Sequence, residues 1–69
     1  MQMYEIGQIT VKASLAGSAL DRYLAYAHQR CADKMDKEGA KNWLMRAKDQ
    51  LETVRVLIID ALDSLEEES

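Results

Sequence analysis

The sequence predicts an all-α fold, an antiparallel two-helix hairpin preceded by a short N-terminal arm. Apolar residues recur every three or four positions through residues 40–65, and a similar stripe runs through residues 20–35. Gly39 separates the two stripes. Two amphipathic helices joined by a short turn pack against each other in opposite directions. We therefore expect a single domain over residues 1–69, with an arm over 1–14, a first helix over 15–37 and a second over 40–67.

The predicted arm reads MQMYEIGQITVKAS. Within it, Ile9, Val11 and Ala13 alternate with polar residues, which is the period of a β-strand. A single strand would have to pair with a strand of another chain. The alternative is an irregular arm whose Met3, Ile6 and Ile9 fold back onto the helices.

The first helix is expected to begin at Ser18, or one turn earlier at Ser14, because a serine hydroxyl caps the first backbone amides of a helix. Gly39 suits the left-handed conformation that ends many helices, and we expect it to reverse the chain. The apolar stripe of this helix comprises Leu20, Leu24, Ala27, Cys31 and Met35, with Tyr23 beside them.

The second helix has the strongest pattern in the chain, an unbroken heptad repeat. Its members are Ala40, Leu44, Ala47, Leu51, Val54, Ile58, Ala61 and Leu65. Trp43, Leu57 and Leu62 widen this stripe to an arc of about 140°, more than one partner helix covers. Met45, Val56 and Ile59 form a second, narrower stripe among acidic residues on the far side.

The sequence therefore has more apolar helix surface than one hairpin covers. We expect the excess to contact a second copy of the chain, another protein, or both. The candidate partner-binding residues are Trp43, Met45, Leu51, Val54, Val56, Ile58, Ile59 and Leu62. Trp43 is also a candidate for the hairpin's own core.

Charge and cysteine content narrow the classes of partner. The formal net charge is −3, which disfavours nucleic acid and anionic membranes. No run approaches the ~20 apolar residues of a membrane span. Cys31 is the sole cysteine, so no disulfide forms within the chain, and a single thiol favours a cytoplasmic location.

No arrangement typical of catalysis or cofactor binding is present. His28 and Cys31 are neighbours on one helix, but a nucleophilic site also needs an oxyanion-binding loop and an orienting group. A zinc site needs three or four ligands, and the chain has no further His or Cys. We expect no enzyme activity, no cofactor and no metal.

A DNA-binding role is the alternative to a protein-binding one. The segment CADKMDKEGAKNWLMRAKD resembles a helix-turn-helix, which would present Lys41, Asn42, Arg46 and Lys48 to DNA. Against it, the second helix is longer than a recognition helix and ends in acidic residues. This alternative is a small homodimeric helical regulator of the size that phages and plasmids encode.

The stretches EGAKNW and LETVRVLIIDAL, at this separation, resemble the small co-chaperones of type III secretion needle subunits. Those proteins are helical hairpins of similar length, although the arm YEIGQITVKA is less like theirs. The resemblance implies packing against a helical-repeat chaperone, so that a needle subunit does not polymerise. It also implies that Leu51, Val54, Ile58 and Leu62 are shared between hairpin core and chaperone contact. The function that the sequence favours is thus a non-enzymatic adaptor, co-chaperone or inhibitor, with homodimerisation expected.

Overall fold

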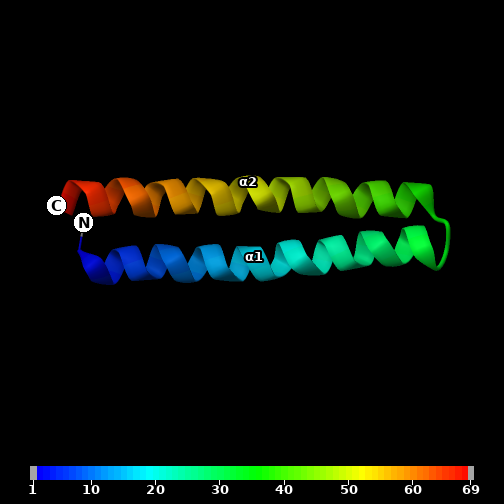
Figure 1. The fold of residues 1–69 in the computed structure, drawn as a ribbon, viewed down its shortest axis with the longest axis horizontal. Coiled ribbons are helices and arrows are strands. Elements are labelled where there is room, and N and C mark those ends of the chain that lie inside the picture. The colour runs from blue at the N-terminus through cyan, green and yellow to red at the C-terminus, as the bar shows by residue number, and fades with distance from the viewer. Residues whose placement is uncertain (1, 69) are drawn as a thin grey trace.

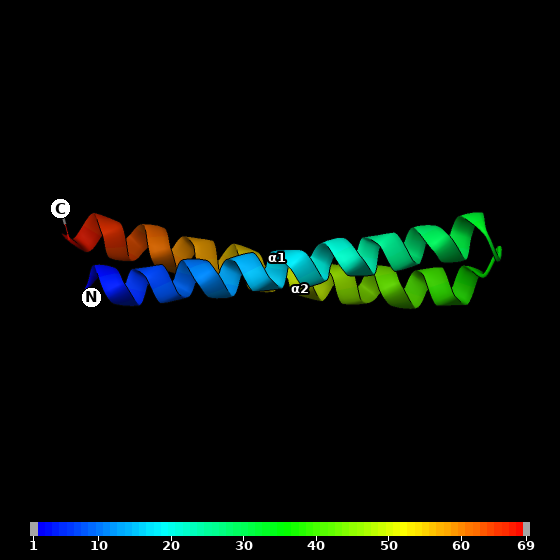
Figure 2. The same ribbon diagram turned by 90° about the horizontal axis from the view of Figure 1, so that it is seen from below.

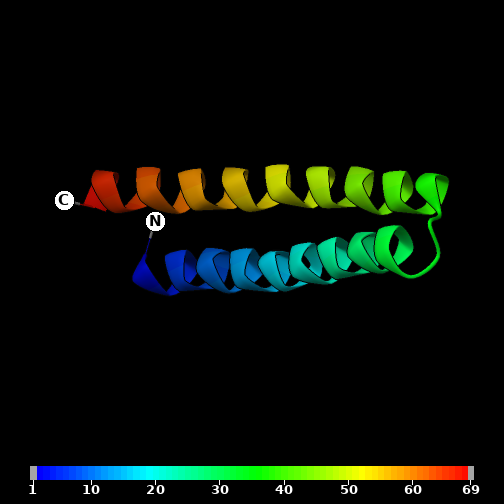
Figure 3. The ribbon, with the colours of Figure 1, turned by 45° about the vertical axis from the view of Figure 1, so that its right-hand side comes forward.

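The computed structural model describes residues 2–68, which form two α-helices (Figure 1). Helix α1 spans Met3–Ala32 and helix α2 spans Lys37–Glu68. The helices run antiparallel and side by side, with the turn at one end and the start of α1 beside the end of α2 at the other (Figures 1 and 3). The Cα atoms extend over 51 × 14 × 11 Å. The predicted all-α hairpin is confirmed, and no described residue lies in a strand.

The predicted N-terminal arm is wrong, because its residues belong to α1. The helix begins at Met3, where the amides of Glu5 and Ile6 donate to the carbonyl of Gln2 at 2.9 and 3.1 Å. Ile6 is buried and Ile9 half-buried against α2, three residues apart as on a helix. These contacts decide the conformation, since packing of an apolar face stabilises a helix more than local propensity does. The predicted caps at Ser14 and Ser18 are also wrong, since both lie inside α1, where the Ser18 hydroxyl donates to the Ser14 carbonyl.

The turn lies earlier than predicted, and Gly39 does not end the first helix. α1 ends at Ala32, and Met35 is the residue with left-handed backbone (φ 50°). Asp36 then begins α2, because its Oδ1 accepts a 2.9 Å hydrogen bond from the amide of Gly39. A Cβ at Gly39 would lie 2.9 Å from Cγ of Asp36, so a glycine is needed beside this cap. Gly39 thus belongs to the first turn of α2.

The two helices meet along an interhelical face that repeats every seven residues. On α1 this face comprises Ile6, Ile9, Ala13, Ala16, Leu20, Tyr23, Ala27 and Arg30, and on α2 Ala40, Trp43, Ala47, Gln50, Val54, Leu57, Ala61 and Ser64, all buried or half-buried. Spacings of three and four residues alternate throughout both sets. A seven-residue repeat keeps two helices in contact when they wind around each other. Figure 2 shows this winding, since the helices cross near the middle of the hairpin.

The predicted stripes are therefore half right. In α2 the structure keeps Ala40, Ala47, Val54 and Ala61 on the interhelical face. The other four heptad positions are displaced by one residue, so Leu44, Leu51, Ile58 and Leu65 are exposed instead of buried. In α1, Leu20, Tyr23 and Ala27 face α2 as predicted, but Leu24, Cys31 and Met35 do not.

Alanine dominates the core of the hairpin. Of the eight buried residues in the described part of the chain, six are alanines and the others are Ile6 and Ser64. No large side chain of the described residues is fully buried. Small residues let two helices approach closely, but each removes little apolar surface from water. The hairpin core is consequently thin, and most of the large apolar side chains lie outside it.

Candidate functional site

Seven of the fifteen large apolar residues that are exposed in the described chain lie along one side of the hairpin. Leu44, Leu51, Ile58 and Leu65 each follow a residue of the interhelical face by one position and are spaced seven apart, so they form a row along α2. The row on α1 beside them holds Met3, Thr10, Gly17, Leu24 and Cys31, also seven apart. We call the large apolar residues of this side the apolar strip: Met3, Leu24, Leu44, Leu51, Ile58, Leu62 and Leu65. They are between 41% and 65% exposed.

Two shallow grooves confirm that both helices contribute to this side. Near the open end, a groove of about 330 Å³ brings Thr10 and Ala13 of α1 together with Ile58, Leu62 and Leu65 of α2. Its lining is almost entirely apolar. The apolar strip is thus continuous across the two helices rather than confined to one of them.

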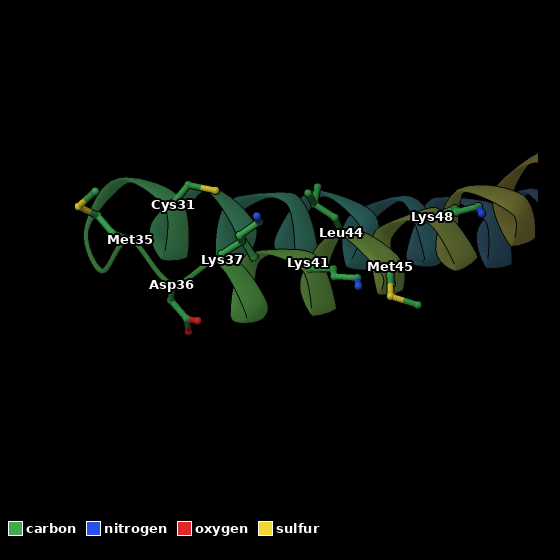
Figure 4. A pocket seen from close by; sticks show the side chains of 9 residues that line it. Cys31, Met35, Asp36, Lys37, Lys41, Leu44, Met45 and Lys48 are labelled. Atoms are coloured by element: carbon green, nitrogen blue, oxygen red, sulfur yellow. The ribbon is translucent and has the colours of Figure 1, made fainter.

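The second groove of this side lies at the turn end (Figure 4). It has a volume of about 700 Å³ and an apolar floor that includes Cys31, Met35, Ala40 and Leu44. Lys37, Lys41 and Lys48 line it from α2. Figure 4 shows Met35 at the turn, Cys31 on α1 and the lysines following one another along α2. We call this site the turn-end groove, and it combines an apolar floor with a basic rim.

The predicted partner-binding residues divide between three surfaces. Leu51, Ile58 and Leu62 lie on the apolar strip, with exposures of 56%, 48% and 53%. Val54 and Trp43 are half-buried on the interhelical face instead. The remaining three, Met45, Val56 and Ile59, are all exposed, and spacings of eleven and three residues keep them on one side of α2, away from the interhelical face.

Trp43 belongs to an aromatic cluster near the turn. Its ring centroid lies 4.7 Å from that of Tyr26 and 5.6 Å from that of Tyr23. The guanidinium carbon of Arg46 lies 5.0 Å from the centroid of the Trp43 ring, a cation–π contact. These contacts hold α1 and α2 together, so Trp43 is part of the hairpin rather than a vacant anchor.

The residues considered for chemistry are not brought together. His28 and Cys31 are both exposed on α1. Among residues 2–68, no group of three or more His, Cys, Asp and Glu side chains is placed to hold a metal ion. Lys41 lines the turn-end groove whereas Arg46 lies over Trp43, so these two cations do not share one surface. Neither described helix is long and apolar enough to cross a membrane.

Sequence reasoning did not identify Met3, Leu24, Leu44 and Leu65 as part of an exposed surface. The sequence does contain an indication of which face packs, namely the alanines of α2 at positions 40, 47 and 61. A heptad through Trp43, Gln50, Leu57 and Ser64 contains two polar residues and looks less apolar than the neighbouring one. This heptad nevertheless lies on the interhelical face. Ala40, Ala47 and Ala61 lie beside it, and their small side chains let α1 approach closely.

Comparisons with models of protein families, with curated proteins and with solved structures found no match to this chain.

Proposed function

We propose that this chain is a non-enzymatic helical module that binds protein through the apolar strip. One observation carries the proposal: the most deeply buried residues of the described chain are mostly alanines, whereas seven large apolar side chains form one exposed strip along the hairpin. A hairpin that depended on its own core alone would bury the leucines and the isoleucine of the strip as well, since burying each side chain is worth about 1.5–3 kcal/mol. Contiguous apolar surface of this kind marks protein interaction sites.

The spacing of the strip favours a helical partner. Side chains repeated every seven residues on two adjacent helices form the surface against which further helices pack in bundles. An adaptor, a co-chaperone and an inhibitor would all use such a face. The resemblance to needle-subunit co-chaperones belongs to the same class, with Leu51, Ile58 and Leu62 in contact with the partner. We place this function in the cytoplasm, as the single cysteine predicts.

The proposal is tested by photo-crosslinking from one side of α2 at a time. A benzophenone amino acid at Leu51 would lie on the apolar strip. The same amino acid at Thr53 is the matched control, since Thr53 is exposed on the same helix and lines a groove with Asp49 and Val56. Irradiation in the cells that produce the protein is expected to give a discrete adduct from position 51 and none from position 53.

The mass of the adduct reports what covers the strip. An adduct of two chains indicates self-association, and a different mass indicates another protein. The absence of any adduct at position 51, or equal labelling at positions 51 and 53, would contradict the proposal.

A further inference from the structure

We infer that the apolar strip binds an acidic amphipathic helix of another protein, whose carboxylates lie against the lysines of α2. This inference rests on the proposed function and specifies the chemistry of its partner. The charged residues that border the strip carry the inference, because on α2 they are all basic.

A basic row borders the strip along α2. Lys41, Lys48 and Arg55 each precede a residue of the strip by three positions, so they lie on the same side of the helix, one row further out. We call these three residues the basic row. Lys41 and Lys48 line the turn-end groove together with Leu44, which agrees with this placement (Figure 4). Arg55 forms a 3.0 Å ion pair with Glu52, and an exposed pair of this kind is easily exchanged for another.

The carboxylates of α2 lie on its other sides. Asp36 lines the turn-end groove just before α2, but its carboxylate caps the helix by accepting from the amide of Gly39. Through residue 67, no acidic residue of α2 falls in the row of Leu44 or in the basic row. By the seven-residue repeat, the acidic residues occupy the three rows away from the strip: Glu38, Asp49, Glu52, Asp60, Asp63, Glu66 and Glu67.

The other edge of the strip, on α1, is nearly free of charge. By the same repeat its outer row holds Gly7, Ser14, Asp21 and His28. A second copy packed strip against strip therefore offers one carboxylate, Asp21, to the basic row. Self-association of the isolated chain leaves most of the row without a counter-charge. An acidic helix consequently binds the strip more tightly and displaces a second copy.

The middle of the strip allows close approach of a covering helix. Gly17 lies in the same row of α1 as Met3 and Leu24, and a Cβ placed on it would meet no atom within 4 Å. The hairpin itself therefore does not require a glycine there, although glycine weakens a helix relative to alanine. The open space at Gly17 lets the covering helix approach the backbone of α1.

The geometry of the strip specifies the sequence pattern of its partner. A helix that lies between two rows of apolar side chains needs apolar residues at alternating spacings of three and four. Because the basic row repeats every seven residues, the partner's Asp or Glu residues recur at the same interval along the edge that faces α2. The strip from Leu44 to Leu65 and the turn-end groove together match a partner helix of about 28 residues, roughly 42 Å long.

An anionic membrane is the other surface that offers both negative charge and an apolar interior. The carboxylates on the other sides of α2 argue against it. They lie about one helix diameter from the strip, roughly 10 Å, which is comparable with the screening length of about 8 Å at physiological salt. An extended anionic surface repels these carboxylates, whereas a single helix contacts only the strip and the basic row.

Two model peptides of about 28 residues test the inference. Both carry leucine at alternating spacings of three and four, and the flanking positions are glutamate in one peptide and lysine in the other. Fluorescence anisotropy of a dye on each peptide measures its binding to the full chain. We expect the dissociation constant of the glutamate peptide to be at least about tenfold lower than that of the lysine peptide. Equal affinities, or tighter binding of the lysine peptide, would overturn the inference.

Charge-neutral variants locate the contact. Lys41→Gln/Lys48→Gln is expected to raise the dissociation constant of the glutamate peptide about tenfold. Lys12→Gln/Lys34→Gln is the matched control and is expected to leave it unchanged, since both lysines are exposed and lie outside the turn-end groove. Circular dichroism verifies that both variants are helical. Equal losses in the two variants would mean that net charge alone attracts the peptide, which overturns the inference.

Light scattering and vesicle binding separate the competing occupants. With the glutamate peptide in excess, we expect the mass of one 7.8 kDa chain plus one peptide. A mass that still contains two chains would overturn the inference, because the second copy would not have been displaced. Vesicles that contain phosphatidylglycerol are expected to retain none of the chain. Retention on these vesicles without binding of the glutamate peptide would overturn the inference in favour of a membrane.

The inference and the proposed function fail in different ways. If position 51 gives an adduct in cells while the chain binds the two peptides equally, the acidic partner is overturned and the proposed function stands. If the peptides are bound equally and position 51 gives no adduct, both are overturned.

Discussion

The ring of Tyr26 on α1 lies 4.7 Å from the ring of Trp43 on α2, with the two planes inclined at 60°. This tilted contact is the arrangement that the aromatic quadrupole favours. It lies three turns or fewer from the chain reversal, between helices whose most deeply buried residues are mostly alanines. The Tyr26–Trp43 pair therefore contributes more to the alignment of the helices than any single alanine contact does.

Replacing Trp43 tests how much the aromatic cluster of Tyr23, Tyr26 and Trp43 contributes to the stability of the hairpin. Trp43→Ala is expected to lower the free energy of unfolding by about 2–3 kcal/mol, somewhat less than for a fully buried tryptophan, because the ring is half-buried. Thermal unfolding followed by circular dichroism measures the change. Trp43→Phe keeps a ring in the cluster and is expected to lose no more than half as much. Equal losses in the two variants would mean that the aromatic contacts are not what stabilises the turn end.

The cap of α2 gives a second prediction. Asp36→Ala removes the acceptor for the amide of Gly39 and is expected to cost about 1 kcal/mol of stability, as loss of an N-cap does elsewhere. Asp33→Ala is the matched control, since Asp33 is an exposed aspartate in the same turn. A loss for Asp33→Ala as large as that for Asp36→Ala would argue that charge in the turn, rather than the cap, is responsible.

Met35 gives a prediction of the opposite sign. It adopts a φ of 50°, which side chains rarely tolerate, and its side chain is 88% exposed. Met35→Gly is expected to raise the free energy of unfolding by up to about 1 kcal/mol, because glycine takes this conformation without strain. Chemical denaturation at a chain concentration low enough to exclude association measures the gain. Any marked loss would show that the methionine makes contacts that offset its strain.

The two glycines of α1, exposed Gly7 and half-buried Gly17, separate the stability of the hairpin from its association. Gly7 and Gly17 both have open space where a Cβ would lie, so alanine at either position should stabilise the hairpin by about 0.5–1 kcal/mol. Only Gly17 lies in the row of α1 that belongs to the side of the apolar strip. Gly17→Ala is therefore expected to weaken dimerisation, and Gly7→Ala to leave it unchanged, in sedimentation equilibrium. The same dissociation constant for both would contradict close approach at Gly17.

The helical hairpin could be predicted from the sequence because its signal is long. Seven-residue spacing through α2 and the polar break near the turn leave few other folds for these residues. The start of α1 could not be predicted in the same way. Ile9, Val11 and Ala13 alternate as a strand does, and only the presence of α2 beside Ile6 and Ile9 decides in favour of helix.

The surface that faces outward was the harder part to predict. The heptad containing Leu44, Leu51, Ile58 and Leu65 is the more apolar of two overlapping repeats, and hydrophobicity alone assigns it to the core. The hairpin instead packs on its alanines. The width of the arc nonetheless predicts that some of it contacts a partner, and the resemblance to needle-subunit co-chaperones places Leu51, Ile58 and Leu62 in that contact. Which part of the arc stays exposed depends on how the two helices pack against each other. The spacing of apolar residues along one helix does not determine this packing.

The account depends most on whether a second chain covers the apolar strip. The solution mass, measured by light scattering after gel filtration over a dilution series, tests this directly. We expect twice the chain mass of 7.8 kDa, and a monomer of unchanged helicity for Leu51→Gln/Ile58→Gln. A control pair on other surfaces, Thr53→Gln/Val56→Gln, is expected to remain dimeric. A mass of 7.8 kDa at every concentration would contradict the account.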